Sequence, residues 1–406
     1  MTTPRSQVTP SVVYVSPDKM GGMMNIIANL IACRHSDSFP AHLILTHNTL
    51  NRDEARFAQS LPCETQTTFE YTLPIENLHA VMNRLARAIP PGPGVIVAGD
   101  LLDLAMLSVH DLGKAVVLIL HGDHDYYYDL AVKHDAVVHA FVAYSRRMYE
   151  RLLEYLPHRS STIFFIPYGI PLPARVRQAR PTADSSPLRA IFAGRLEHGQ
   201  KGVLDLPKID ALLCAKGLEL GWTIVGSGPD AGRLEDAWAK AIASNRVHMT
   251  GALANCATID RMADHDVFVL PTRYEGFPVA LLEAMGTGLV PVVSAIDSGV
   301  PEVVEPGVTG LMPAVGDVVG FAESIERLSK DRATLERLSG RCRELVVTRY
   351  DIRARAASYD ELYAGYRELY RPLSKDATLQ YGSRLDRKWV PNPIVRLVRS
   401  AIRSTR

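Results

Sequence analysis

The segment DVFVLPTRYEGFPVALLEAMGTGLVPVV, from Asp266 to Val293, carries the clearest structural pattern in the sequence. An apolar run, VFVL, is followed by a loop, an apolar helical stretch, a glycine-rich turn and a second apolar run, VPVV. Runs this apolar suit strands that are buried on both faces of a parallel sheet. The segment therefore predicts strand, loop, helix, turn and strand, which is the repeating unit of an α/β fold.

The same alternation of apolar runs and helical patterns extends outward from this segment. We predict strands at Val12–Val15, His42–Thr46, Val95–Ala98, Val116–Leu120, Ile191–Ala193, Trp222–Val225, Val247–Thr250, Val267–Leu270 and Val290–Val293. Helical patterns lie near Glu76–Ala88, Tyr144–Tyr155, Phe321–Leu328, Leu335–Val346 and Ala354–Tyr370. Repeated strand-then-helix order implies parallel sheets with right-handed crossovers. We predict an α/β chain of two Rossmann-like doubly wound domains facing a cleft, with the ligand at the carboxyl ends of the strands.

A change of composition at Pro167–Pro187, with five prolines, separates the two domains. Such a stretch is typical of an extended linker. We expect an N-terminal domain over residues 1–170, a linker over 171–187 and a second domain over 188–350. We also expect residues 351–370 to form a helix that packs back toward the N-terminal domain, and 371–406 to form a basic tail.

The composition excludes several classes of protein. The 406 residues are 47% hydrophobic and 22% charged, with a net charge of +1, so no global field favours nucleic acid. Five cysteines lie far apart, without metal or redox spacing, which is typical of reduced thiols in a cytosol. The N-terminus MTTPRSQVTP is polar, so we expect no signal peptide and a cytoplasmic protein.

The helix after the first strand of the opening segment predicts an anion site. The amides of Gly276 and Phe277 precede a helix whose first turn would hold Pro278, and unpaired amides at a helix N-terminus favour phosphate. Glu275 lies in the loop before this helix, and Glu283 lies near its far end.

Three further segments add candidate ligand-binding groups. FAGRLEHGQKG, from Phe192 to Gly202, puts Arg195 and Lys201 in the loop after a strand, where two cations can clamp a diphosphate. WTIVGSGPD contributes a turn at Gly226. VHMTGAL, with Gly251 and Leu253, offers backbone contacts to a nucleobase.

These four segments, in this order between Phe192 and Leu311, resemble the GT-B glycosyltransferases, specifically the large retaining family 4. Two glutamates separated by seven residues, Glu275 and Glu283, are that family's hallmark, and the Arg-then-Lys loop and the GSGP turn belong to the same pattern. The first half of the chain resembles the family more weakly, through Gly21-Gly22 and His121. The resemblance implies a retaining glycosyltransferase that takes a sugar from a nucleotide-sugar, with UDP favoured as the base and GDP next.

The resemblance also implies a role for each matching residue. The implied catalytic residues are His121, Glu275, Arg195 and Lys201. The implied donor-binding residues are Gly21, Gly22, Arg195, Lys201, Gly226, Gly251, Leu253, Glu275, Gly276, Phe277, Pro278 and Glu283. The cations would hold the diphosphate, Glu283 the ribose hydroxyls, and His121 the sugar. We expect no cofactor and no metal ion, since the two cations neutralise the leaving group; the acidic triplets Asp123–Asp125 and Asp264–Asp266 are the alternative metal sites.

Simpler interpretations of these residues remain open. Glu283 is alternatively a solvated helix residue, Arg195 a strand-end cap, His121 a satisfied buried histidine, and Gly21-Gly22 a tight turn. The run Tyr126–Tyr128 is a candidate acceptor contact or a packing element. A nucleotide-sugar epimerase of the same fold and a non-catalytic nucleotide-sugar-binding subunit are the alternative functions.

The acceptor is predicted to be a hydroxyl of a glycan, a lipid-linked molecule or a small molecule, in glycan, glycolipid or polysaccharide biosynthesis.

The tail from Arg371 onward holds nine basic and two acidic residues. Within PNPIVRLVRSAIR the apolar residues share one side of a helix, with Trp389 at its edge and arginines on its flanks, among them Arg403. We expect peripheral contact with an anionic membrane face; a packing helix and a disordered basic end are the alternatives.

Overall fold

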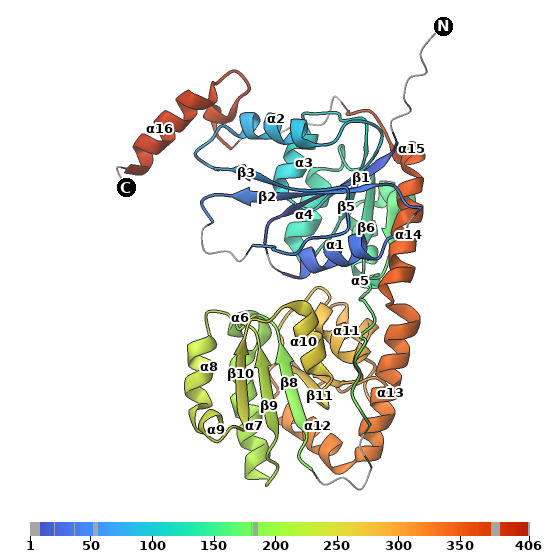
Figure 1. Cartoon of the computed structure of the whole chain (residues 1–406), viewed down its shortest axis with the longest axis vertical. Coiled ribbons are helices and arrows are strands. Elements are labelled where there is room, and N and C mark those ends of the chain that lie inside the picture. Colours follow the sequence, from blue (N-terminus) through green and yellow to red (C-terminus); the bar gives the residue numbers. More distant parts are fainter. Residues whose placement is uncertain are drawn as a thin grey trace. The chain divides into compact units, whose positions relative to one another are not determined.

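The chain of the computed structural model divides into two compact units, of which unit 1 is built from two separate stretches of sequence and unit 2 from one (Figure 1). Unit 1 is Met1–Tyr168 together with Arg353–Arg406, and unit 2 is Gly169–Ile352. The structure describes residues 9–19, 21–35, 37–51, 56–179, 181, 186–374 and 382–404.

Unit 1 is built on a parallel sheet whose seven described strands run in the order β3-β2-β1-β4-β5-β6-β7. The order reverses beside β1, so the loops after β1 and β4 flank a topological switch point. The apolar strands are buried because helices cover both faces of such a sheet. The strands are β1 Ser11–Pro17, β2 Ala41–Asn48, β3 Thr65–Tyr71, β4 Gly94–Ala98, β5 Ala115–Ile119, β6 Ala140–Ala143 and β7 Ile163–Phe165.

The helices of unit 1 come from both ends of the chain. They are α1 Gly22–Ala32, α2 Leu78–Ala88, α3 Leu101–Leu107, α4 Asp125–Lys133, α5 Arg146–Tyr155, α14 Ile352–Ala364, α15 Tyr366–Leu369 and α16 Asn392–Ser404, with 3₁₀ turns η1 Pro157–Thr162 and η4 Arg384–Asp386. The helix α14 is fixed to the N-terminal sheet by an edge-to-face contact of Tyr363 with Tyr14, at 6.3 Å between ring centroids. Arg34 after α1 donates to Asp360 at 2.7 Å.

Unit 2 is built on a second parallel sheet, with its described strands in the order β10-β9-β8-β11-β12. Its switch point lies between β8 and β11. The strands are β8 Arg189–Ala193, β9 Gly221–Val225, β10 Val247–Gly251, β11 Val267–Leu270 and β12 Val290–Val293. The helices are α6 His198–Lys201, α7 Leu206–Ala215, α8 Ala231–Ala237, α9 Ala239–Ala243, α10 Asn255–Met262, α11 Val279–Gly286, α12 Val318–Lys330 and α13 Arg332–Arg349, with 3₁₀ turns η2 Val203–Asp205 and η3 Val300–Glu302.

The proline-rich segment after β7 runs along unit 2. The Ile170 amide donates to the Tyr350 carbonyl at 2.8 Å, and the Arg177 amide donates to the Thr287 carbonyl at 2.8 Å. The Arg177 side chain also pairs with Asp266 at 3.1 Å. The first residues of the predicted linker, 171–179, therefore belong to unit 2. Residues 180 and 182–185 of the predicted linker lie outside the described residues.

The structure contains every strand that the sequence predicts, and β3, β6 and β7 in addition. Strand β3 is mostly exposed, so it has no apolar run to reveal it. The strands β6 and β7 are only four and three residues long. Both sheets are doubly wound, as predicted.

Across the described residues, no helix combines the length and the apolar character needed to cross a bilayer.

Candidate functional site

The candidate site of unit 2 lies at the carboxyl edge of its sheet. Arg195 and Lys201 follow β8, Gly226 follows β9, Gly251 ends β10 and Glu275 follows β11. Parallel strands bring the loops at their carboxyl ends to one edge, and the switch point between β8 and β11 is where a ligand crevice is expected.

An ion pair between Lys201 and Glu275 joins the loops on either side of this switch point. The Lys201 side chain is 16% exposed and the Glu275 side chain 7%. The Thr272 hydroxyl, which is fully buried, donates to the same Glu275 oxygen at 3.0 Å. The sequence predicted both charged residues for this site but gave no sign of their pairing or of Thr272.

Backbone contacts hold these two loops together. Gly202 has a φ of +64°, and a Cβ on it would stand 1.9 Å from the Pro271 carbonyl oxygen. The Arg273 amide donates to the Gln200 carbonyl at 2.8 Å, and the Thr272 hydroxyl, whose single proton Glu275 and this carbonyl share, lies 3.0 Å from the same carbonyl oxygen. The position of Lys201 is therefore set by glycine geometry and backbone hydrogen bonds.

Arg195 occupies a different environment from Lys201. Its side chain is 65% exposed, and its Nε lies 3.3 Å from Glu197. The structure brings Lys201 to Glu275 and leaves Arg195 at the surface beside its own loop neighbour. An exposed pair of this kind contributes little to stability, so Arg195 keeps the freedom to turn toward an anion.

The turn after β9 packs against the loop after β8. A Cβ on Gly226, whose φ is +145°, would stand 1.9 Å from the Gly194 carbonyl oxygen. A Cβ on Gly228 would stand 2.4 Å from the Leu196 carbonyl oxygen. Both glycines of the GSGP turn thus allow the loops after β8 and β9 to pack closely. The sequence alone did not show that Gly226 is needed for this packing.

The loop after β10 is more open. The Gly226 amide donates to the Gly251 carbonyl at 2.9 Å. Gly251 is exposed, with a φ of +70°, and a Cβ on it would meet no described atom within 4 Å. Leu253 is half-buried. Backbone atoms of this loop are therefore accessible, as a nucleobase contact requires.

The helix α11 begins one residue later than predicted. Pro278 is its N-cap, with an extended ψ of 106°, and Val279 is the first helical residue. The Gly276 carbonyl accepts from the Gly299 amide at 3.1 Å. Phe277 is buried, and its ring centroid lies 6.0 Å from that of Tyr350. The Phe277 side chain therefore belongs to the core.

Glu283 is a buried carboxyl group in α11, with 4% of the residue exposed. Burial raises its pKa to about 7, although the hydrogen bond that it accepts from the Asn255 side chain acts in the opposite direction. This bond is 2.8 Å long. This burial excludes the alternative that Glu283 is a solvated helix residue. Its contact with Asn255, which lies 28 residues away in the chain, could not be predicted from the sequence.

In unit 1, His121 follows β5 with an unsatisfied imidazole. Both ring nitrogens are buried and have no hydrogen-bond partner among the described residues. Burial lowers its pKa to about 4, so the ring is neutral at pH 7 and offers one donor and one acceptor. Within the described residues, His121 therefore lacks the hydrogen bonds that a satisfied buried histidine would have.

The glycine pair after β1 also faces open space. Gly22 begins α1, and Gly21 is its N-cap without a side-chain hydrogen bond. A Cβ on either glycine would meet no atom of the described residues within 4 Å. The space before this helix is accessible to a ligand that the backbone approaches.

The acidic triplets and the tyrosine run divide into structural and exposed members. Asp123 is buried and accepts from Tyr128, Arg147 and Arg151 at 2.6–3.0 Å. Asp264 pairs with Arg175, and Asp266 with Arg177. Tyr128 is therefore a packing residue, whereas Tyr126 is exposed, with its hydroxyl 3.1 Å from Asp100. No cluster of three or more metal-ligating side chains occurs in the described part of the chain.

Residues 187–331 match the sequence profile of the family described as Glycosyl transferases group 1. The chain is 33% identical over 153 residues to an amylovoran biosynthesis glycosyltransferase, AmsK, of Erwinia amylovora, covering 36% of this chain and 37% of that protein. It is 28% identical over 186 residues to an alpha-D-kanosaminyltransferase of Streptomyces kanamyceticus, covering 46% and 47%. The chain thus spans less than half the length of these curated relatives.

Among solved structures, Anabaena Alr3699/HepE in complex with UDP-glucose is similar, with a TM-score of 0.69 and 16% identity, covering 87% of this chain and 99% of that one. This likeness and the two parallel sheets confirm the predicted fold, which is the GT-B fold of two Rossmann-like domains.

We predict that Gly226→Ala destabilises unit 2, because its Cβ would overlap the Gly194 carbonyl. Overpacking and the strained φ together should cost about 2–4 kcal/mol of unfolding free energy. Chemical denaturation checks this value. Gly232→Ala, at a helical position where a Cβ meets no described atom within 4 Å, is the control and should be neutral or slightly stabilising. Equal stabilities of the two variants would contradict the close approach.

Proposed function

We propose that the protein is a retaining glycosyltransferase. It would move a sugar from a nucleotide-sugar to a hydroxyl acceptor in glycan, glycolipid or polysaccharide biosynthesis. UDP-sugars are the favoured donors and GDP-sugars the next. The observation that carries the proposal is the Lys201–Glu275 ion pair at the switch point of unit 2, in a segment that matches group 1 glycosyl transferases.

The groups around this ion pair suit the parts of a nucleotide-sugar. Lys201 and the exposed Arg195 would bind the diphosphate, and the amides before α11 would add hydrogen bonds and the positive end of a helix dipole. Glu283 would accept hydrogen bonds from the ribose hydroxyls, because its second oxygen is not needed by Asn255. The accessible backbone near Gly251 would contact the base.

Retention follows from the roles proposed for these residues. Glu275 is already bonded to Lys201 and Thr272, so it would orient the sugar hydroxyls rather than attack the anomeric carbon. The bond between the anomeric carbon and the diphosphate oxygen would break first, with the charge on that oxygen stabilised by Lys201 and Arg195. The same oxygen would then take the proton of the incoming hydroxyl, which attacks from the side that the diphosphate leaves. An α-linked donor would give an α-linked product.

His121 belongs to unit 1, on which the acceptor is also proposed to bind. The neutral, unpartnered imidazole of His121 would exchange hydrogen bonds with a sugar hydroxyl. The acceptor is proposed to be a glycan, a lipid-linked molecule or a small molecule. The names of the two relatives favour transfer over epimerisation, and the UDP-glucose complex of the structural neighbour supports UDP.

A panel of nucleotide-sugars tests the proposal directly. The best donor, present at 100 times its Kd, should add about 2.7 kcal/mol to the stability of the chain. In the presence of an acceptor, NMR of the anomeric proton should show an α-linked product from an α-linked donor. A β-linked product would contradict retention, and donor binding with conversion of the sugar but without transfer would identify an epimerase.

Lys201→Ala is expected to lower kcat by about 10²–10³-fold, the usual effect of removing one preorganised group that stabilises charge in the transition state. Steady-state kinetics with the best donor measures this effect. Lys208→Ala is the matched control, because Lys208 is 61% exposed and pairs with Asp205, three residues before it. Similar rates for the two variants would remove Lys201 from the proposed site.

Donor affinity should fall in acid because Glu283 must be ionised to accept ribose hydroxyls. Its pKa of about 7 means that below neutrality a proton must leave before the donor binds. We expect Kd to rise about tenfold between pH 8 and pH 6, measured by calorimetry. An esterified β-phosphate lacks the ionisation near pH 6 of a terminal phosphate, so a nucleotide-sugar is the ligand to use. Glu283→Gln should bind more weakly and without this slope; an unchanged slope would assign it to another group.

A further inference from the structure

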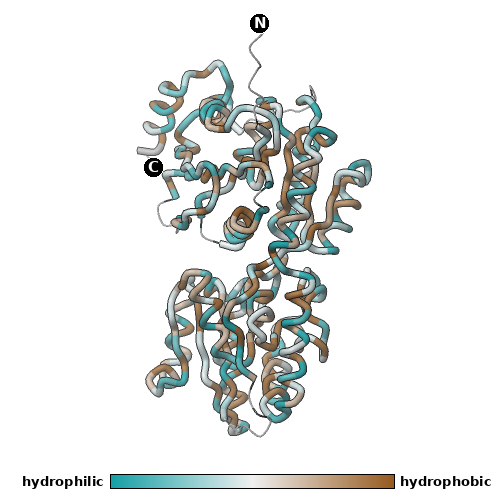
Figure 2. The backbone as a smooth tube through the Cα atoms, turned by 45° about the vertical axis from the view of Figure 1, so that its right-hand side comes forward, coloured by the Kyte–Doolittle hydropathy of each residue, from teal (hydrophilic) through white to brown (hydrophobic). Residues whose placement is uncertain are grey.

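The helix α16 presents its apolar side to solvent. Leu397 is 74% exposed, Ile402 54% and Ile394 53%, and Trp389 in the turn before the helix is 69% exposed. Val395, which the sequence placed on the same side, is instead fully buried. The side chain of Arg403 lies outside the described residues. Figure 2 shows hydrophobic residues recurring between hydrophilic ones along this C-terminal helix.

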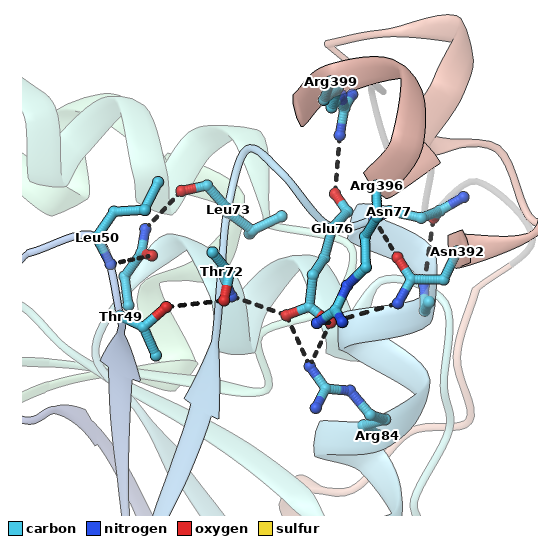
Figure 3. Close-up of polar contacts among 12 residues, drawn as sticks. Thr49, Leu50, Thr72, Leu73, Glu76, Asn77, Arg84, Asn392, Arg396 and Arg399 are labelled. Atoms are coloured by element: carbon cyan, nitrogen blue, oxygen red, sulfur yellow. Dashed lines mark hydrogen bonds and ion pairs between the residues drawn. The ribbon is translucent and has the colours of Figure 1, made fainter. Parts of the chain in front are cut away.

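The polar side of α16 faces the rest of unit 1 and forms hydrogen bonds and ion pairs with it (Figure 3). Arg396 pairs with Glu76 at 2.9 Å, and the Asn392 side chain accepts from the Asn77 amide at 2.8 Å. Arg399 pairs with Asp386 at 3.0 Å and donates to the Glu76 carbonyl at 2.8 Å. These contacts fix the rotation of the helix about its axis, beside the start of α2 (Figure 1).

The surroundings of Glu76 favour the ionised form of its side chain. It is 1% exposed, and it also accepts from the Thr72 amide at 2.7 Å and from Arg84 at 3.0 Å. Burial acts to raise its pKa, but the Thr72 hydrogen bond and the charges of Arg84 and Arg396 hold the pKa below its usual value. A buried, ionised glutamate thus anchors the basic side of α16 at neutral pH.

The orientation of α16 is the opposite of the one that amphipathic helices usually have. An amphipathic helix on a globular protein normally buries its apolar stripe and exposes its charges. Here five of the fifteen large hydrophobic residues that are exposed in the described chain lie within Trp389–Ile402. A contiguous apolar surface of this kind marks an interaction site.

The charges around this apolar surface indicate which kind of partner it would bind. Residues 371–406 carry nine basic and two acidic side chains, a net charge of +7. Arg384, Arg387 and Lys388 precede the helix, and Arg387 lies 5.8 Å from the centroid of the Trp389 ring. An apolar helix face with an aromatic residue at its edge and basic residues beside it suits the boundary between acyl chains and anionic headgroups.

We propose that α16 lies in the plane of an anionic membrane surface, with Ile394, Leu397, Val398 and Ile402 inserted among the acyl chains. The contacts of α16 with Glu76 and Asp386 would then hold the rest of unit 1 at that surface. The proposal is independent of the proposed transfer reaction, since none of the donor-site residues takes part.

Flotation of the full chain with vesicles tests this proposal. The vesicles are phosphatidylcholine mixed with phosphatidylglycerol, and pure phosphatidylcholine for comparison. The variant Leu397→Gln/Ile402→Gln removes apolar surface without changing charge. Val319→Gln/Val347→Gln is the control, because these residues are 54% and 44% exposed on α12 and α13 of unit 2. Circular dichroism and thermal melting establish that both variants are folded.

We expect the unsubstituted chain and the control to float with the anionic vesicles. The α16 variant should partition at least about tenfold more weakly, because two large side chains no longer leave water. Equal flotation of the two variants, or equal binding of the unsubstituted chain to pure phosphatidylcholine, would overturn the proposal. So would a dimer in analytical ultracentrifugation that the α16 variant abolishes, since a second copy would then cover this face.

Discussion

Close backbone contact between neighbouring loops is the constraint on which the unit 2 site depends. The Gly194 carbonyl and the Pro271 carbonyl occupy the space that a Cβ on Gly226 and on Gly202 would need. Parallel strands bring the loops to one edge of the sheet, but these contacts decide which atoms meet there. The Lys201–Glu275 ion pair follows from them, because it joins two loops whose backbones are already bonded to each other.

The candidate site residues of the two units differ in their hydrogen bonding. In unit 2 the charged groups already have protein partners, so a ligand would have to share Lys201 with Glu275 and Glu283 with Asn255. In unit 1 the imidazole of His121 has no partner among the described residues, and a Cβ on Gly21 or Gly22 would meet none of the described atoms within 4 Å. Buried polar groups without partners are costly, so a hydrogen bond from a ligand to His121 would recover more free energy than one to a satisfied group.

The sequence predicted the fold better than it predicted the contacts. Buried parallel strands such as β5 and β11 are continuous apolar runs, and these can be recognised without a structure. The edge strand β3 is polar because it faces solvent, so it carries no such sign. The candidate site residues after β8 and β11 were predicted from their motifs. The burial of Glu283, its bond to Asn255 and the packing reason for Gly226 arise from tertiary structure. The reversed orientation of α16 depends on Glu76, more than 300 residues away in the chain.

The division of the chain has a consequence for its biosynthesis. Unit 2 is one continuous stretch, Gly169–Ile352, whereas unit 1 is completed only by residues after Arg353. Tyr14 in β1 is covered by Tyr363, and Arg34 donates to Asp360, so both residues lack these partners until the whole of unit 2 has been synthesised. Domains ordinarily fold in the order in which they are translated. Here the first stretch of unit 1 is synthesised before unit 2 but acquires its native packing only after it, so a truncation that removes α14 damages the sheet of unit 1.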